Sequence, residues 1–137
     1  MALTHLLDTS VLTRLNHPTV RSAVEPLAAA GRAARAGISD LEIGFSARNA
    51  TEWNQLTSAL TVFDLVETTA RHIQRARTVQ RQLALTSQRG HKIPDLLVAA
   101  AAEQARLTVL HYDTDFDIIS AVTGQACEWV TPPGTIS

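Results

Sequence analysis

Residues 108–119, TVLHYDTDFDII, run from an apolar segment into three aspartates at alternate positions. The apolar segment, residues 107–110, predicts a buried strand, and residues 115–122 predict a short helix after it. The aspartates are Asp113, Asp115 and Asp117. Two unpaired carboxylates about 4 Å apart repel each other by roughly 4 kcal/mol near a protein surface. Their grouping therefore requires an explanation, which can be a divalent metal, a neighbouring arginine, or solvent exposure of acids that cap the helix.

Short apolar runs elsewhere in the chain predict further strands at residues 3–7, 62–66 and 127–130. Apolar residues at helical spacing predict helices at residues 19–35, 39–47, 69–85 and 94–104, a short helix after Asp8, and another that carries Trp53, Leu56 and Leu60. Strands that alternate with helices indicate an α/β fold with a mostly parallel central sheet. The length of 137 residues fits a single domain, residues 1–137.

The composition excludes several classes of protein. The single cysteine, Cys127, cannot form a disulfide within the chain, which fits a reducing compartment. The first ten residues, MALTHLLDTS, lack the regions of a signal peptide, and no segment reaches the roughly 18 apolar residues of a membrane span. We therefore expect a cytoplasmic protein with no membrane partner. The net charge of -1 excludes neither a metal nor a nucleic acid, because the distribution of charge matters more than its sum.

Four acids occupy the same kind of place in this predicted fold. Asp8 and Asp113 each follow a predicted strand, and Glu42 and Asp95 each lie in the first turn of a predicted helix. In an open parallel sheet these points lie along one edge, where ligands bind. Each acid alone could be a helix cap or a partner of the helix dipole, and Ser39 with Glu42 fits a capping box. However, each such contact contributes only about 0.3–1 kcal/mol, so repulsion among four acids favours a bound cation.

The donor types favour Mg²⁺ or Mn²⁺ over zinc, because the acids lack a cluster of cysteine or histidine. The five histidines have no metalloprotease spacing, and we interpret them as structural or surface residues, leaving open His5 and His111, which lie near the acids. An EF-hand loop beginning at Asp113 would have glycine and glutamate where Ile118 and Gly124 stand. A dehalogenase-type phosphatase would carry its Asp-x-Asp motif near the N-terminus, whereas here it lies late in the chain.

Four segments, taken in order, resemble the PIN-domain ribonucleases, and among them the VapC-type toxins of bacterial toxin-antitoxin pairs. The segments are LLDTSVL at 6–12, ISDLEIGF at 38–45, IPDLLVAAAA at 93–102 and VLHYDTDFD at 109–117. Each motif is weak alone, but four in order at suitable separations are specific. The resemblance covers nearly the whole chain and implies a three-layer α/β/α PIN-like domain with a mostly parallel central sheet.

The resemblance also implies roles for individual residues. Asp115 matches the second aspartate of the closing motif and is expected either as a further metal ligand or as an acid just outside the ligand set. Thr9 and Ser10 match small hydroxyl positions that orient the first carboxylate or a water. The implied activity is cleavage of RNA phosphodiesters by water that Mg²⁺ or Mn²⁺ activates, which leaves 5′-phosphate and 3′-hydroxyl ends. The catalytic and metal-binding quartet would be Asp8, Glu42, Asp95 and Asp113.

The implied partners are a VapB-type antitoxin, an RNA substrate and a second copy of the chain in a homodimer. The apolar helices at residues 19–35 and 41–60 are candidates for the groove that receives an amphipathic antitoxin segment. A basic run without acids could hold the RNA backbone, although a solvated helix face or a dimer surface would explain it equally well. Its cations are Arg71, Arg75, Arg77, Arg81, Arg89 and Lys92.

Two other functions stay open at this point. One is a catalytically inactive PIN-fold module that binds RNA or a protein, and the other is a phosphatase or DNA nuclease that uses the same metal site. Trp53 and Trp129 could stack on bases, but the helical spacing of Trp53 with Leu56 and Leu60 favours a place for it in a core or interface.

Overall fold

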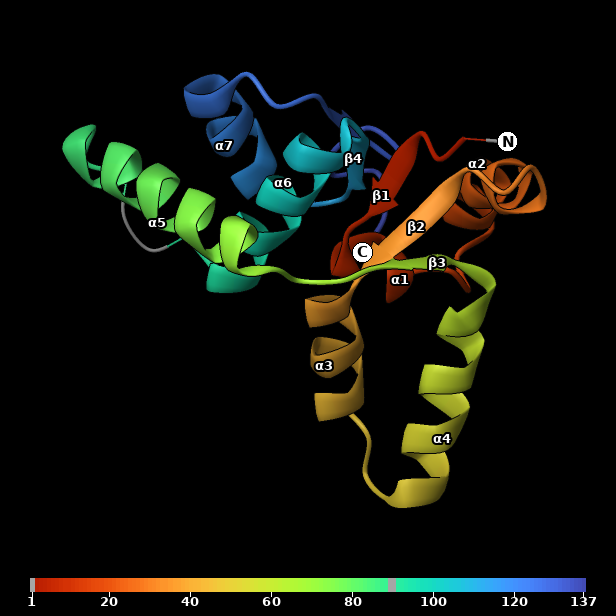
Figure 1. Ribbon diagram of the computed structural model, residues 1–137. Helices are drawn as coiled ribbons and strands as arrows, with labels where there is room; N and C mark the ends of the chain where they lie inside the picture. Colours follow the sequence, from red (N-terminus) through yellow and green to blue (C-terminus); the bar gives the residue numbers. More distant parts are fainter. Residues whose placement is uncertain (1, 89–90) are drawn as a thin grey trace.

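The computed structural model of the protein describes residues 2–88 and 91–137. Within these residues, five parallel strands form one sheet in the order β3-β2-β1-β4-β5 (Figure 1). The predicted α/β fold with a parallel central sheet is therefore confirmed. The strands are β1 (His5–Leu7), β2 (Ala33–Ala36), β3 (Asp64–Val66), β4 (Thr108–His111) and β5 (Cys127–Trp129).

Helices cover both faces of this sheet. They are α1 (Thr9–Leu12), α2 (Pro18–Ala29), α3 (Gly37–Phe45), α4 (Ala50–Ala59), the 3₁₀ turn η1 (Leu60–Val62), α5 (Ala70–Leu85), α6 (Ile93–Ala105) and α7 (Asp115–Thr123). In Figure 1, α5, α6 and α7 lie to the left of the strands and α2 lies to the right. The helices α3 and α4 form a hairpin that projects away from the sheet (Figure 1).

The alternation of side chains along the strands produces two separate cores. Leu6 and Val109 face a core that they share with α5, α6 and α7. Leu7 and Leu110, the next residue along in each strand, face a second core that they share with α1, α2 and α3. Successive strand residues point to opposite faces, so a strand buried on both sides must be apolar at every position. The resulting three-layer α/β/α arrangement confirms the predicted architecture.

The prediction of one helix across residues 19–35 is wrong at its C-terminal end. The helix α2 ends at Ala29, and Gly31 adopts a left-handed conformation with φ of 68°. The following segment, Ala33–Ala36, forms β2 and pairs with β1 on one side and β3 on the other. Alanine favours helices, but here its small side chain fits a central strand covered on both faces, so tertiary pairing overrides the local preference.

The predicted strand at residues 62–66 is shorter in the structure. Leu60 and Phe63 are both buried, and their three-residue spacing fits the turn η1 rather than the alternation of a strand. The strand β3 begins only at Asp64.

The order of the strands fixes where a ligand can bind. The chain winds from β1 through β2 to β3 in one direction and from β4 to β5 in the other. The carboxyl ends of β1 and β4 therefore meet at the point where the winding reverses, which is where open α/β sheets bind ligands. Asp8 follows β1 directly, and Asp113 lies two residues beyond β4.

Candidate active site

A small cleft at this edge of the sheet brings together the four predicted acids. We call it the acidic cleft, and its volume is about 220 Å³. Each acid comes from a different segment: one directly follows β1, one belongs to α3, one belongs to α6, and one lies in the β4–α7 connection. The cleft is lined by Asp8, Glu42, Asp95 and Asp113, and also by Thr9, Ser10, Thr13, Arg14, Lys92 and Tyr112.

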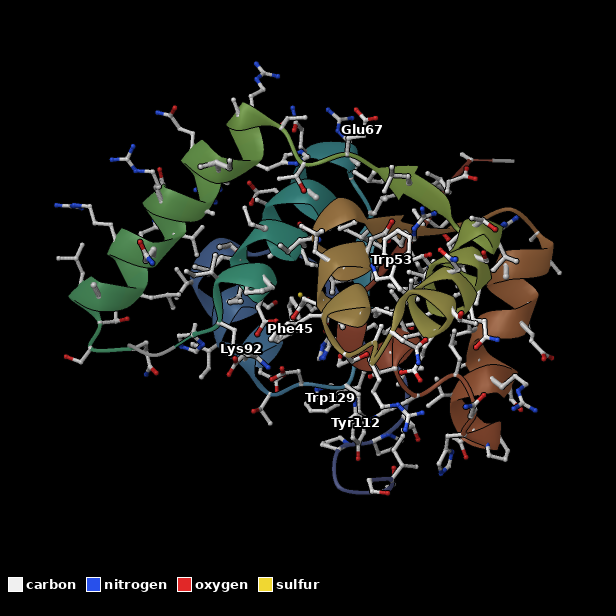
Figure 2. All side chains as sticks on the ribbon, turned by 90° about the horizontal axis from the view of Figure 1, so that it is seen from below. Phe45, Trp53, Glu67, Lys92, Tyr112 and Trp129 are labelled. Atoms are coloured by element: carbon white, nitrogen blue, oxygen red, sulfur yellow. The ribbon has the colours of Figure 1, made fainter. Side chains whose placement is uncertain are left out.

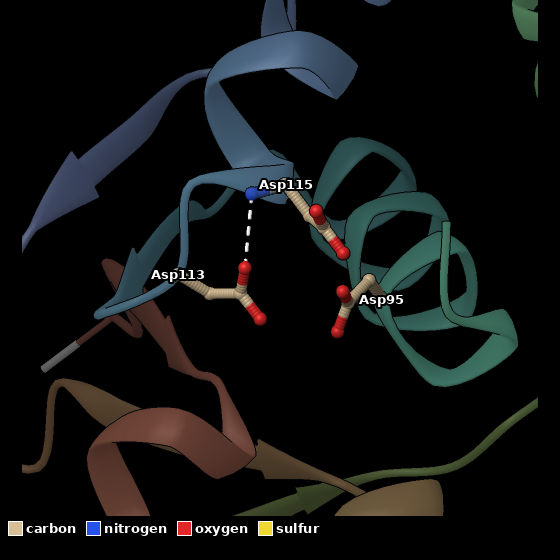
Figure 3. Close-up of side chains that lie close together, drawn as sticks. All are labelled: Asp95, Asp113 and Asp115. Atoms are coloured by element: carbon tan, nitrogen blue, oxygen red, sulfur yellow. Dashed lines mark hydrogen bonds between the residues drawn. The ribbon is translucent and has the colours of Figure 1, made fainter. Parts of the chain in front are cut away.

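Three carboxylates in this region form a tight group. Asp95, Asp113 and Asp115 each offer one oxygen, and these three oxygens lie within 4.8 Å of one another. Figure 3 shows the three side chains pointing toward one another from α6, the β4–α7 connection and the start of α7. The backbone N–H of Asp115 donates to Asp113 Oδ1 at 2.9 Å, which fixes the Asp113 carboxylate. The structure therefore places Asp115 with two acids of the predicted quartet.

Asp8 is held in place by the residue two positions after it. Its carboxylate accepts hydrogen bonds from Ser10 N at 2.9 Å and Ser10 Oγ at 2.6 Å, so Asp8 is the N-cap of α1. Ser10 Oγ in turn accepts from Tyr112 N at 2.9 Å. One serine thus connects the ends of β1 and β4 and orients a carboxylate that is only 2% exposed.

Glu42 is held by Thr9 rather than by the predicted capping box. The helix α3 begins at Gly37 with Ala36 as its N-cap, so Ser39 lies inside the first turn and cannot cap it. Thr9 Oγ1 donates to Glu42 Oε1 at 2.7 Å and lies 2.8 Å from Ser39 Oγ. Because Thr9 has only one hydroxyl proton, the Glu42 carboxylate and Ser39 Oγ compete for it as acceptors.

Asp95 has the least favourable surroundings of the four acids. It is 4% exposed, and its Oδ2 accepts no hydrogen bond within residues 2–88 and 91–137. Burial raises the pKa of Asp95 to about 8, and the charge of Asp8 and the nearby Asp115 carboxyl group add to this effect. Burial also raises the pKa of Asp8, with a further contribution from Glu42. Two buried acids that resist ionisation, one with an unsatisfied oxygen, fit a site for a hard divalent cation such as Mg²⁺ or Mn²⁺.

Lys92 supplies a positive charge at the mouth of the acidic cleft. Its Nζ lies 2.6 Å from Asp113 Oδ2 and 3.8 Å from Asp95 Oδ2. The hydrogen bond to Asp113 raises the pKa of Lys92. Burial acts to raise the pKa of Asp113, but hydrogen bonds from Lys92 and from the Asp115 backbone leave it below its ordinary value. The ammonium group therefore occupies part of the space in which a metal would contact these two carboxylates.

We expect replacement of Lys92 with methionine to tighten Mn²⁺ binding by about fivefold, because competition from an exposed ion pair is worth about 1 kcal/mol. Isothermal titration calorimetry of the two proteins measures this difference directly. Arg71→Met, which removes an exposed cation on α5, is the matched control and should leave the affinity unchanged. Equal or weaker Mn²⁺ binding by Lys92→Met would show that the ammonium does not compete.

Most of the other predicted RNA-binding cations lie away from the acidic cleft. Arg75 forms an ion pair with Glu103 at 2.7 Å, and Arg77 and Arg81 line a separate groove along α5. In Figure 2 the outer face of α5 points away from Lys92. Arg71 is exposed on the same helix, and Arg89 lies outside the described residues. Of the five cations of this run that the structure describes, Lys92 is the one that lines the cleft.

Arg14 and Tyr112 line the cleft although the sequence did not mark them. The Arg14 guanidinium lies 5.0 Å from the centre of the Tyr112 ring, and its Nη1 donates to Ser10 O at 2.7 Å. Tyr112 precedes Asp113 directly, which is the only sequence signal for it.

The two histidines left open have structural surroundings. His111 is fully buried, and its Nδ1 accepts from Asp113 N at 3.2 Å, so it supports the Asp113 backbone. Burial lowers the pKa of His111, which keeps its ring neutral. His5 Nε2 lies 3.7 Å from Glu128 Oε2, on the edge strand β5.

Sequence comparisons show relatives that extend over nearly the whole chain. The family model of the PIN domain matches residues 5–122. Ribonuclease VapC51 of Mycobacterium tuberculosis is 64% identical over 136 residues, which cover 99% of this chain and 99% of that protein. Ribonuclease VapC21 of the same organism is 43% identical over 139 residues, with 98% and 99% coverage. These matches agree with the family that the four motifs indicated.

Solved structures show the same fold at lower identity. The structure of VapBC2 from Rickettsia felis bound to a promoter DNA fragment matches with a TM-score of 0.76 and 18% identity, over 94% of this chain and 98% of that chain. VapBC-5 from Mycobacterium tuberculosis matches with a TM-score of 0.65 and 21% identity, over 96% and 98%. At such identities the likeness concerns the fold alone. Within the part of the chain that the structure describes, no helix has the length and hydrophobicity needed to cross a membrane.

Proposed function

This chain belongs to the VapC-type branch of the PIN-domain family, and from that premise we propose that it is a Mg²⁺- or Mn²⁺-dependent endoribonuclease and the toxin of a toxin-antitoxin pair. The observation that supports this proposal most strongly is the convergence of Asp8, Glu42, Asp95 and Asp113 on one cleft at the switch point of the sheet. We further propose that residues 1–137 act as one domain, because both cores use the same strands.

The proposed mechanism assigns separate tasks to the residues of the acidic cleft. The carboxylates of Asp95, Asp113 and Asp115 would hold the metal, and Asp8 and Glu42 would complete its surroundings. When bound, the metal supplies Lewis acidity that activates a water for attack on phosphorus and offsets charge in the transition state. Ser10 and Thr9 keep Asp8 and Glu42 in fixed orientations, so little reorganisation is needed during the reaction. Lys92, once displaced from Asp113, is placed to contact a phosphate of the substrate.

The direct test is cleavage of total cellular RNA by the purified protein, freed of any partner, in Mg²⁺ or Mn²⁺. We expect discrete fragments with 5′-phosphate ends, and no fragments in EDTA. Cleavage that persists in EDTA would contradict metal dependence. A folded protein that binds Mn²⁺ but cleaves neither RNA nor DNA would favour the inactive binding module, and cleavage of DNA alone would change the substrate class.

Thr9 provides a second test of the cleft. We expect Thr9→Val to lower the rate of RNA cleavage by about 10- to 100-fold, because a hydrogen bond to a charged group contributes about 1.5–3 kcal/mol. Thr9→Ser keeps the hydroxyl group and should retain most of the activity. If valine and serine at this position gave equal rates, the bond to Glu42 would have no part in catalysis.

We also propose where the antitoxin binds. An apolar groove of about 390 Å³ lies between α1, α3 and α4, and its walls include Leu12, Leu15, Ile43 and Leu60. It shares Thr13 and Glu42 with the acidic cleft, so a helix bound there would lie beside the active site. The groove fits the apolar face of an amphipathic helix, as expected for a VapB-type antitoxin segment.

A further inference from the structure

A second hollow adjoins the acidic cleft on the side of β4 and β5. We call it the aromatic pocket, and its volume is about 380 Å³. Tyr112 and Asp113 line both the pocket and the cleft, so the two spaces are adjacent. The aromatic pocket is lined by Tyr112, Asp113, Thr114, Trp129, Pro133 and Gly134. Apart from Asp113 at the boundary with the cleft, these side chains carry no charge, so the pocket suits a flat and largely apolar group.

Two aromatic rings form the walls of this pocket. The rings of Tyr112 and Trp129 are perpendicular, with their centres 5.5 Å apart. In Figure 2 these two side chains lie next to each other, on the same side of the molecule as Lys92. At this distance the edge of one ring lies against the face of the other, so the two rings form one continuous aromatic wall of the pocket. The surface of this wall that faces the pocket can interact favourably with another aromatic ring.

Both rings are fixed by hydrogen bonds at their polar atoms. Trp129 Nε1 donates to Asp117 Oδ1 at 3.0 Å. The Tyr112 hydroxyl donates to Ile136 O at 2.7 Å and accepts from Ile136 N at 3.1 Å. These bonds restrict the rotation of both rings before any ligand binds. Binding of a planar ligand would therefore cost little conformational entropy in these two side chains. Asp117, in the first turn of α7, thus positions Trp129.

Cations lie on the cleft side of the same boundary. The Arg14 guanidinium lies against the Tyr112 ring at 5.0 Å from its centre, and Lys92 Nζ lies 2.6 Å from the shared Asp113. Two cations therefore stand among the carboxylates of the cleft, and aromatic surfaces line the space next to it. This is the arrangement by which proteins bind single-stranded nucleic acid, with cations along the backbone and aromatic rings under the bases.

We propose that the aromatic pocket binds an unpaired nucleobase of the RNA, from the nucleotide next to the cleaved phosphate. This inference rests on the proposed function and adds a site, formed by Tyr112 and Trp129, that contacts a base rather than the backbone. Because every base can stack, the pocket selects for an unpaired strand more strongly than for one particular sequence.

Fluorescence of Trp129 tests this binding without any measurement of cleavage. The chain has two tryptophans, so a Trp53→Phe variant leaves Trp129 as the only source of tryptophan emission. Adding Asp95→Asn, with EDTA present, prevents cleavage during the titration. We expect a single-stranded RNA oligonucleotide to quench the Trp129 emission with saturation, and an abasic oligomer of the same length to leave it nearly unchanged. Equal quenching by the abasic oligomer would overturn the proposal.

Substitutions give the second part of the test. We expect Trp129→Ala to weaken binding of the oligonucleotide by roughly 5- to 100-fold, as found for loss of one stacked base, and Trp129→Phe to retain most of the affinity. Trp53→Ala, outside the pocket, is the matched control. Unchanged RNA affinity of a folded Trp129→Ala protein would overturn the proposal, as would quenching by an antitoxin peptide but not by RNA. RNA cleavage by wild-type protein alongside either negative result would leave the proposed nuclease function intact.

Discussion

Replacement of Asp95 with asparagine is expected to reduce RNA cleavage by about a thousandfold or more and, at the same time, to stabilise the metal-free protein. The loss of activity follows because Asp95 is a member of the tight carboxylate group. Metal-ion catalysis contributes several kcal/mol to transition-state stabilisation, and each 1.4 kcal/mol corresponds to about tenfold in rate. The variant keeps the size and shape of the side chain, so the loss would reflect the missing charge.

The gain in stability has a different cause. The ionised form of Asp95 is buried, repelled by Asp8, and has an oxygen without a hydrogen-bond donor among the described residues. Asparagine removes the cost of ionisation, and we expect the free energy of unfolding at pH 7.5 in EDTA to rise by about 2 kcal/mol. Thermal unfolding of the two proteins measures this difference. Asp64→Asn, at an exposed position of β3, is the matched control.

A fall in the melting temperature of Asp95→Asn would contradict this interpretation. It would mean that Asp95 acts mainly as a favourable charge at the N-terminus of α6, which was the simpler reading of its position in the sequence. The combination of lost activity and increased stability is informative, because a purely structural residue would lose both.

The parts of the fold that the sequence predicted well are those in which local pattern and tertiary environment agree. The apolar strand β4, the following acids and the helix α7 lie where residues 107–122 placed them. The strand β2 was missed because its sequence, Ala33–Ala36, is helix-favouring, and only pairing with β1 and β3 makes it a strand. A central strand made of alanine has no local signal that distinguishes it from the end of the preceding helix.

In the candidate site, too, some features have a local sequence signal and others depend on tertiary contacts. Asp8 and Asp113 could be predicted because an acid after a buried strand of a parallel sheet lies at the ligand-binding edge. The partners of these acids depend on contacts between distant segments, such as Thr9 with Glu42 and Ser10 with the Tyr112 backbone. No spacing rule in the sequence encodes such pairs.

The location of the basic run relative to the cleft also depends on tertiary packing. The helix α5 buries His72, Ala76, Val79 and Leu83, and this choice of face directs its arginines elsewhere. Among the described cations of this run, Lys92, which lies beyond that helix, is the one that lines the cleft. The positions of these cations followed from how α5 packs against α6 and α7, which the run of charges alone does not determine.

The second large effect is the pH dependence of the free energy of unfolding, and its direction should change when metal is added. The pKa of Asp95 is about 8 in the folded protein and has an ordinary value of 3.8. Between these values the folded chain holds a proton that the unfolded chain has released, so stability must fall as pH rises. For the metal-free protein we expect a loss of about 2 kcal/mol in the free energy of unfolding between pH 6.5 and 8. Burial lowers the pKa of His111, and this makes stability rise with pH, but only below the ordinary His value of 6.5. The pH range for the measurement therefore begins at 6.5.

Urea unfolding in EDTA at several pH values, repeated with saturating Mg²⁺, measures both effects. A cation that binds the ionised carboxylates of the folded state adds about 2.7 kcal/mol at a hundred times its dissociation constant. Because this gain is largest where the acids are ionised, the stability in Mg²⁺ should stay level or rise toward pH 8. Asp95→Asn should reduce the pH dependence in EDTA, whereas Asp64→Asn should keep it. The part that remains in Asp95→Asn would come from Asp8, whose pKa is also raised by burial. A wild-type protein whose stability in EDTA is constant from pH 6.5 to 8 would show that Asp95 ionises normally, and the cation would then not be needed to stabilise this buried group.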